Sequence, residues 1–162
     1  MKAMLDDLDW HILAELQADG RVTNVELARR VGISAPPCLR RVRALEEAGL
    51  VRGYRALLDE KALGFDIVAY AMVGLESQSE ADLVAFEQTV IGWSVVRECY
   101  AVSGDVDFIL KCVASDFDAF QRFVINELTA SENVATVRTA LTLRRVKDTG
   151  VAPIALPDAQ TC

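Results

Sequence analysis

Three arginines within four residues give this chain its clearest chemical signal: Arg40, Arg41 and Arg43. A guanidinium group donates a pair of hydrogen bonds to the O6 and N7 atoms of guanine, and it also binds phosphate oxygens. Nucleic acid presents both kinds of acceptor, so the cluster favours contact with DNA. We expect Arg40 and Arg43 to lie near bases and Arg41 to lie nearer phosphate.

The segment that positions these arginines runs from residue 23 to residue 45 and is typical of two short helices joined by a tight turn. Thr23 is expected to cap the first helix, and Glu26, three residues later, to complete a capping box. Gly32 follows where a left-handed residue is needed to end that helix. Ser34 is expected to cap the second helix.

The second helix carries the arginines on its polar side and has two prolines in its first turn, where a missing N–H group costs little. Such a helix pair is typical of a helix-turn-helix, whose second helix enters the major groove of DNA. Two core helices with solvated arginines are the alternative that the pattern alone leaves open. Backbone N–H groups at the start of the second helix are further candidates for binding phosphate. The residues that we predict to contact DNA are Thr23, Ser34, Ala35, Pro36, Pro37, Leu39, Arg40, Arg41 and Arg43.

The charge distribution supports this assignment although the whole chain carries a net charge of −7. Residues 21–55 hold eight arginines and three glutamates, a net charge of +5, so the remainder carries −12. A basic segment on an acidic body still attracts phosphates, because electrostatic attraction acts within a Debye length of about 10 Å. The acidic remainder then repels DNA that lacks the specific sequence.

Composition argues against several other classes of protein. No apolar run reaches the roughly 18 residues that a membrane-spanning helix needs, and the N-terminal residues lack the apolar region of a signal peptide. We therefore expect a cytoplasmic protein with no membrane partner. The four cysteines form no C-x-x-C pair and the chain has one histidine, so we expect no zinc site, no disulfide and no cofactor.

The pattern changes near Phe65, and strands then alternate with helices. Strands are predicted over residues 67–75, 95–103, 108–113 and 137–144, with a turn at 104–107. Helices are predicted from a cap at Ser79 to Gly92 and after a cap at Asp116, the latter with Phe117, Phe120, Val124 and Leu128 inside. The order β-α-β-β-α-β is that of a ferredoxin-like domain, an antiparallel four-stranded sheet with both helices on one face.

The predicted fold class is therefore α+β. An N-terminal helix-turn-helix domain with its linker spans residues 1–60 and begins with a further helix at Asp6 or Asp7, which Gly20 ends. Two glycines flank a β-prone run at residues 49–55, which is expected to form a hinge or a small wing, so the domain is of the winged type if the wing forms. The βαββαβ domain spans residues 61–150, and an irregular tail spans residues 151–162.

The open face of the predicted sheet is expected to be apolar. It would expose Ile67, Ala69, Ala71 and Val73, or their neighbours in the same strand. An exposed apolar sheet face usually marks an interface, so we expect a dimer formed sheet to sheet and possible higher assembly. A dimer also suits DNA, because two recognition helices then meet half-sites about 34 Å apart.

The turn between the second and third strands has the sequence G-D-V-D. Gly104 lets the backbone approach a ligand closely, and Asp105 and Asp107 offer carboxylates to an ammonium group. Ordinary hairpin-turn chemistry, with the aspartates bonding their own backbone, is the alternative. The two carboxylates could also serve an enzyme or a metal ion, but the chain lacks a nucleophile–base set and a glycine-rich phosphate loop. We therefore expect no catalytic residue and no metal ligand.

Two stretches carry a family resemblance: LDWHILAELQADGRVTNVELARRVGISAPPCLRRVRALEEAGLVRGYRALLD and ECYAVSGDVDFILK. With the order of elements, they make the chain similar to the Lrp/AsnC family, the feast/famine regulators of bacteria and archaea, from Leu8 to about Thr149. The resemblance implies a sequence-specific regulator of transcription, not an enzyme, that binds double-stranded DNA. It also implies that the second domain binds a small effector and assembles the protein.

In this family the effector is usually an amino acid bound between subunits, and it changes assembly or DNA affinity. Members are built from dimers, often four of them in an octamer, and many control genes of amino-acid metabolism or transport. This chain departs from the family at Pro36, where many members have threonine or serine, and at Trp10, where a basic or polar residue is common. A sensor or adaptor that does not bind DNA is the alternative function. By the resemblance, the effector-binding residues are Ser103, Gly104, Asp105, Val106 and Asp107.

Overall fold

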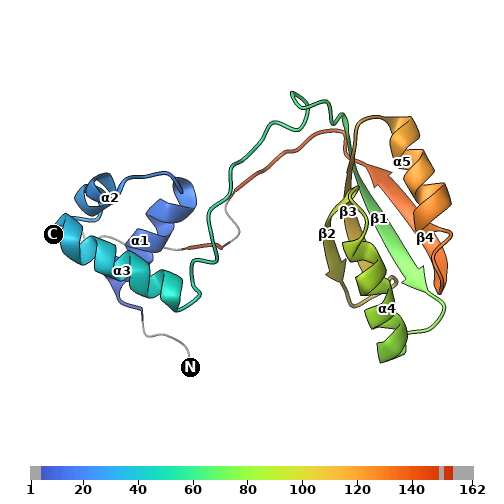
Figure 1. The fold of residues 1–162 in the computed structure, drawn as a ribbon, viewed down its shortest axis with the longest axis horizontal. Coiled ribbons are helices and arrows are strands. Elements are labelled where there is room, and N and C mark those ends of the chain that lie inside the picture. Colours follow the sequence, from blue (N-terminus) through green and yellow to red (C-terminus); the bar gives the residue numbers. More distant parts are fainter. Residues whose placement is uncertain (1–4, 150–151, 155–162) are drawn as a thin grey trace. The chain divides into compact units, whose positions relative to one another are not determined.

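A computed structural model describes residues 5–149 and 152–154 of the chain. Its contacts divide the described residues into two compact units: unit 1 holds those up to Leu57 and from Lys147 onwards, and unit 2 is Leu58–Val146. The elements, labelled in Figure 1, are α1 (Asp7–Ala18), α2 (Asn24–Arg30), α3 (Ala35–Glu47), β1 (Ile67–Leu75), α4 (Glu80–Ile91), β2 (Val96–Ala101), β3 (Phe108–Ala114), α5 (Phe117–Phe123), the π-helical turn η1 (Val124–Leu128) and β4 (Val134–Leu141).

Unit 1 packs three helices around a small apolar core. Asp6 caps α1 in a reciprocal arrangement with Asp9, since each side chain accepts a hydrogen bond from the other residue's backbone N–H, at 2.9 and 3.2 Å. The helix ends at Ala18, slightly before the predicted Gly20. Gly32, with φ +75°, adopts the left-handed conformation predicted for it after α2. The buried core residues are Ile12, Leu27, Ala28, Cys38 and Leu45.

The caps of α2 and α3 differ from the sequence prediction in instructive ways. The Thr23 hydroxyl accepts a hydrogen bond from the backbone N–H of Glu26 at 3.3 Å, so that cap is confirmed. The other half of the predicted capping box is wrong, because the Glu26 carboxylate binds arginines of its own helix. Ser34 occupies the cap position of α3, but its side chain makes no cap hydrogen bond. A cap hydroxyl accepts from the second or third residue of a helix, and here these are Pro36 and Pro37, which have no N–H.

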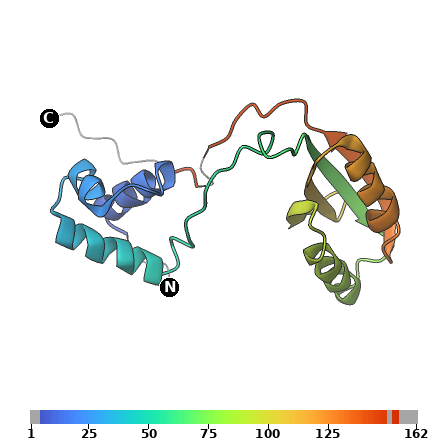
Figure 2. The ribbon, with the colours of Figure 1, turned by 45° about the horizontal axis from the view of Figure 1, so that its top comes forward.

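The segment after α3 has no regular structure. Gly49 turns the chain with φ +71°, and residues 50–59 form bends and irregular backbone without a strand. Residues 49–55 were predicted to form a hinge or a small wing, and their backbone forms no strand in this structure. Residues 58–66 then run beside residues 142–146 within unit 2, where Arg145 donates a hydrogen bond to the Glu60 carboxylate at 3.0 Å (Figure 2).

Unit 2 has the predicted βαββαβ architecture. Its sheet has the strand order β2-β3-β1-β4, and every neighbouring pair is antiparallel. Both helices cover the same face of the sheet (Figures 1 and 2). The predicted bounds of β1 and the predicted cap of α4 at Ser79 are confirmed. The predicted bounds of the last strand, residues 137–144, are wrong, since β4 spans Val134–Leu141 and Leu143 beyond it is 98% exposed.

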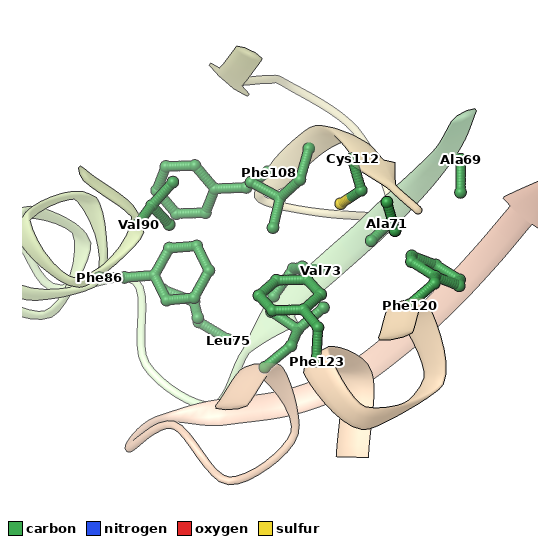
Figure 3. Packing of buried hydrophobic residues seen from close by; sticks show 13 residues of the cluster. Ala69, Ala71, Val73, Leu75, Phe86, Val90, Phe108, Cys112, Phe120 and Phe123 are labelled. Atoms are coloured by element: carbon green, nitrogen blue, oxygen red, sulfur yellow. The ribbon is translucent and has the colours of Figure 1, made fainter. Parts of the chain in front are cut away.

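The core of unit 2 lies between that face and the helices. Small residues of β1, Ala69 and Ala71, leave room for the rings of Phe120 and Phe123, which point at the strand in Figure 3. Phe123 also stacks edge to face on Trp93, with ring centroids 5.3 Å apart. Aromatic side chains thus join the two helices to the sheet.

The helix after Asp116 buries different residues from those predicted. Phe120 and Leu128 are buried as expected, but Phe117 is 51% exposed and the unpredicted Phe123 is buried. The cause is the π-helical turn, whose wider i to i+5 spacing brings Leu128 to the same side as Phe123. A search for α-helical spacing alone could not find this pair.

The open face of the sheet, which no helix covers, carries a different set of β1 side chains from Ala69, Ala71 and Val73. Ala69, Ala71 and Val73 are fully buried under the helices, so of the two predicted alternatives the first does not hold and the second, their neighbours, does. Because side chains alternate along a strand, Val68, Tyr70 and Met72 lie on the open face instead. Within the part of the chain that the structure describes, no helix combines the length and apolar character needed to cross a membrane.

Candidate functional site

The outer side of α3 presents the strip predicted to contact DNA. Pro36, Arg40 and Arg43 follow one another at helical spacing and are all exposed, and Leu39 beside them is 37% exposed. Among residues 5–149 and 152–154, neither Arg40 nor Arg43 has a hydrogen-bond or ion-pair partner. Both guanidinium groups are therefore open to an external acceptor.

Arg41 lies on a different side of α3 and is already engaged. Its Nη1 atom donates to Asp6 Oδ2 at 2.8 Å and to Asp9 Oδ1 at 2.7 Å, both at the start of α1. These hydrogen bonds raise the pKa of Arg41, and they join the backbone N–H of Asp9 in lowering the pKa of Asp6. The phosphate contact predicted for Arg41 would have to compete with two ion pairs. Arg41 thus links α3 to the start of α1 through two ion pairs.

The start of α3 offers a hydroxyl that the helix does not use. Ser34 is exposed and, because of the two prolines, has no helix N–H to accept from. Asn24 Nδ2 donates to the carbonyl oxygen of Ala35 at 2.8 Å, which ties the first turn of α3 to α2. Ala35 and Pro37 are half-buried, and Thr23 is exposed and caps α2. Of these residues, Ser34 is therefore best placed to bind a phosphate.

Ion pairs reduce the positive charge that unit 1 can offer to a ligand. Glu26 accepts from Arg29 at 2.7 Å and from Arg30 at 2.9 Å, and these hydrogen bonds lower the pKa of Glu26 to about 2. Arg30 also pairs with Glu15 at 2.9 Å. Three of the eight arginines counted above, Arg29, Arg30 and Arg41, are thus paired with carboxylates within unit 1. Within the described chain, those without an ion pair are Arg21, Arg40, Arg43, Arg52 and Arg55.

The loop predicted to bind the effector is a tight turn closed by backbone hydrogen bonds. Val102 N–H donates to the carbonyl oxygen of Asp107 at 2.9 Å. Gly104 has φ +139°, a conformation that L side chains rarely adopt. Ser103, Gly104 and Asp105 are exposed, whereas Val106 and Asp107 are half-buried.

The two aspartates of this loop have different roles. The Asp107 carboxylate accepts from the backbone N–H of Leu75 at 2.7 Å and from Gln78 Nε2 at 2.8 Å. The hypothesis that both aspartates bond their own turn is therefore wrong for Asp107, which bonds the end of β1 and the segment after it. Asp105 has no hydrogen-bond partner in the described residues, so its carboxylate is free for an external cation.

A polar cluster next to this loop was missed from the sequence. Asn133 binds both backbone groups of Ser77, accepting from its N–H at 2.8 Å and donating to its carbonyl at 2.9 Å. The hydroxyls of Ser77 and Ser79 both donate to Asp82 Oδ2, which lowers the pKa of Asp82. Asn133 adopts φ +64°, which asparagine tolerates better than most residues. Two sequence signals were available: an asparagine before a strand, and the S-x-x-D spacing of Ser79 and Asp82 at a helix start.

In the ranges that the structure describes, no three His, Cys, Asp or Glu side chains are grouped to hold a metal ion. Cys38 and Cys112 are buried, and burial raises the pKa of Cys112 to about 12, which keeps it a thiol. Cys99 is exposed.

Comparison with known proteins matches both units. The model of the Lrp/AsnC ligand binding domain matches residues 68–152, and the model of a winged helix-turn-helix DNA-binding domain matches residues 5–52. A leucine-responsive regulatory protein from Rhizobium meliloti (strain 1021) is 64% identical over 148 residues, which cover 91% of this chain and 95% of that protein. The Bkd operon transcriptional regulator of Pseudomonas aeruginosa is 38% identical over 152 residues, covering 94% and 99%.

A solved structure of similar fold also belongs to a transcriptional regulator. The crystal structure of a transcriptional regulator from Neisseria meningitidis in complex with L-Met has a TM-score of 0.88 and 36% identity to this chain, covering 93% of this chain and 97% of that one. These relatives are transcriptional regulators, so the enzyme alternative is not supported. With an exposed arginine strip on a helix-turn-helix, followed along the chain by a βαββαβ unit, the chain belongs to the Lrp/AsnC family of transcriptional regulators.

Proposed function

We propose that this regulator reads its operator with the outer strip of α3. Arg40 and Arg43 are directed at base edges, and Ser34 binds phosphate at the helix start. The observation that carries the proposal is the division of labour on α3: two arginines have no partner among the described residues, while Arg41 is held by Asp6 and Asp9. A braced helix presents its free guanidinium groups in a fixed register, which base recognition requires.

We further propose that an amino acid binds at Ser103–Asp107 and alters operator binding. An amino acid carries an ammonium group, which suits the carboxylate of Asp105, a group without a hydrogen-bond partner among the described residues. The Neisseria relative was solved with L-Met, which supports this class of ligand. Control of amino-acid metabolism or transport genes, and a cytoplasmic location, complete this proposal.

The open face of the sheet supports a dimer as the working unit. Beside the apolar residues of β1, it carries Ile109 and Val113 of β3 and Tyr100 of β2, which is 55% exposed. We propose that a second copy of the chain covers this face. We propose further that such dimers assemble into larger oligomers, as in family members that form octamers of four dimers. Met72→Glu is expected to yield monomers, with the mass measured by light scattering.

A titration of DNA from upstream of the protein's own gene tests the DNA proposal. Arg40→Ala and Arg43→Ala are each expected to weaken binding by about 1–3 kcal/mol if the arginine reads a base. Binding should fall steeply between two salt concentrations. Arg122→Ala, an exposed arginine of unit 2, is the matched control and should bind as the wild type does. Unchanged binding by both α3 variants would contradict the assignment of the strip.

A further inference from the structure

The loop Ser103–Asp107, here called the effector loop, is hydrogen-bonded to a segment for which the sequence predicted no contact with it. This segment, residues 75–79, links β1 to α4, and its contact with the loop runs through Asp107. One carboxylate oxygen of Asp107 accepts from Leu75 N–H at 2.7 Å, and the other accepts from Gln78 Nε2 at 2.8 Å. The backbone N–H of Asp107 donates to the carbonyl oxygen of Val73 at 2.9 Å.

These bonds decide which carboxylate of the loop meets a ligand. Asp107 is half-buried, and both of its oxygens already accept strong charge-assisted hydrogen bonds. Asp105 is exposed and has no partner in the described chain. Asp105 is therefore the carboxylate available to pair with the ammonium group of a ligand, as long as Asp107 keeps its hydrogen bonds. The Leu75 N–H belongs to the backbone at the end of a strand, so among the described residues Gln78 is the one side chain that donates to Asp107.

Gln78 can hold Asp107 because its own segment is clamped. Asn133 binds both backbone groups of the adjacent Ser77, and the hydroxyl of Ser77 donates to Asp82 in the first turn of α4. The backbone N–H of Glu76 donates to the carbonyl oxygen of Asn133 at 2.8 Å. The Gln78 side chain itself is exposed and packs in no core, so removing it does not open a cavity.

We infer that Gln78 is a positioning residue of the effector site. It fixes the Asp107 carboxylate, and thereby the shape of the loop that presents Asp105 and Gly104 to the amino acid. This inference rests on the proposed effector site at Ser103–Asp107 and extends that site onto the segment between β1 and α4. A glutamine at this place acts through its hydrogen-bond donor, so another donor at the same place preserves the function.

The test compares variants of the full chain in operator titrations with L-methionine or L-leucine added. Gln78→Ala is expected to raise the amino-acid concentration that gives the half-maximal shift about fivefold, the loss expected for one hydrogen bond. Gln78→Lys keeps a donor and should respond nearly as the wild type does. Gln78→Glu places a second carboxylate against Asp107 and should respond less than Gln78→Ala. The control is Gln88→Ala, an exposed glutamine of α4, which should change nothing.

A role in folding alone would give a different pattern. DNA affinity without amino acid, native mass and unfolding midpoint should be the same for Gln78→Ala and for the wild type. If Gln78→Ala responds at wild-type amino-acid concentrations, or if Gln78→Lys responds no better than Gln78→Ala, the inference is overturned. If the wild type binds DNA but responds to neither amino acid, the proposed effector function itself fails for these ligands, and this inference falls with it.

Discussion

The two helix caps of unit 1 make a sharp prediction, because they look alike in sequence and differ in structure. Thr23 caps α2 through a hydrogen bond to the backbone N–H of Glu26, whereas Ser34 caps nothing, since Pro36 and Pro37 lack the N–H groups that it would bind. Replacing each residue by alanine therefore removes a cap in one case and only an unused hydroxyl in the other.

The magnitudes follow from these contacts. Loss of a capping side chain costs about 1 kcal/mol of stability, so Thr23→Ala should lower the free energy of unfolding by about that amount. Ser34→Ala should stay within about 0.5 kcal/mol of the wild type, as an ordinary surface substitution does. In the Pro37→Ala background a backbone N–H is restored at the third helical position. There Ser34→Ala should again cost about 1 kcal/mol.

Urea denaturation of the full chain measures these differences. Trp10 lies in α1 of unit 1 and Trp93 lies in unit 2, so a Trp93→Phe background leaves a single tryptophan that reports on unit 1. The midpoint should move at constant slope, which shows that stability and not compactness has changed. Operator affinity measured on the same proteins should fall for Ser34→Ala if its hydroxyl binds phosphate.

Two results would refute this reasoning. If Ser34→Ala lowers the free energy of unfolding as much as Thr23→Ala does, the Ser34 hydroxyl stabilises unit 1 through a contact of its own. If Ser34→Ala costs the same with Pro37 and with Ala at that position, the missing N–H is not the reason for the absent cap.

Three further predictions concern stability. A Cβ at Gly74 would lie 2.7 Å from Thr136 Oγ1, so Gly74→Ala should destabilise unit 2 by about 1–3 kcal/mol in urea denaturation, and adding Thr136→Ala should restore most of the loss. The pKa of Glu26 is lowered from 4.5 to about 2, so its contribution is fully present above about pH 4.5 and is lost as the pH falls toward 2. Acid unfolding followed by circular dichroism should therefore be less steep for Glu26→Gln over that interval. Asn133→Ala should be less stable than Asn133→Gly by about 1 kcal/mol, because glycine tolerates the positive φ and both variants lose the bonds to Ser77; equal urea midpoints would contradict this.

Local patterns in the sequence predicted much of the fold. The apolar run at residues 67–75 became β1 with the same bounds, and the serine at position 79 became the cap of α4. Gly32 ended its helix in the left-handed conformation. Each of these features depends on residues within a few positions of one another, which is the range over which propensity and capping act.

Features that depend on distant partners could not be predicted. Arg41 meets acidic residues more than thirty positions away, and Asp107 meets the end of a strand at a similar separation. Helical spacing separates Arg41 from Arg40 and Arg43, but no local signal indicates that Asp6 and Asp9 bind it. The face of β1 that is buried depends likewise on where the helices pack, so the alternation alone left two choices.

The two hydrophobic cores of this chain share no residue, and this has a consequence for calorimetry. Each core can give its own melting transition, so one calorimetric scan can report the stability of each unit separately. A ligand present at a hundred times its Kd adds about 2.7 kcal/mol to the unit that binds it. Operator DNA should therefore shift the transition of unit 1, and an amino acid that of unit 2. If a ligand also shifts the transition of the unit that does not bind it, that shift measures the coupling free energy between the two sites. This coupling is what allows an effector to change DNA affinity.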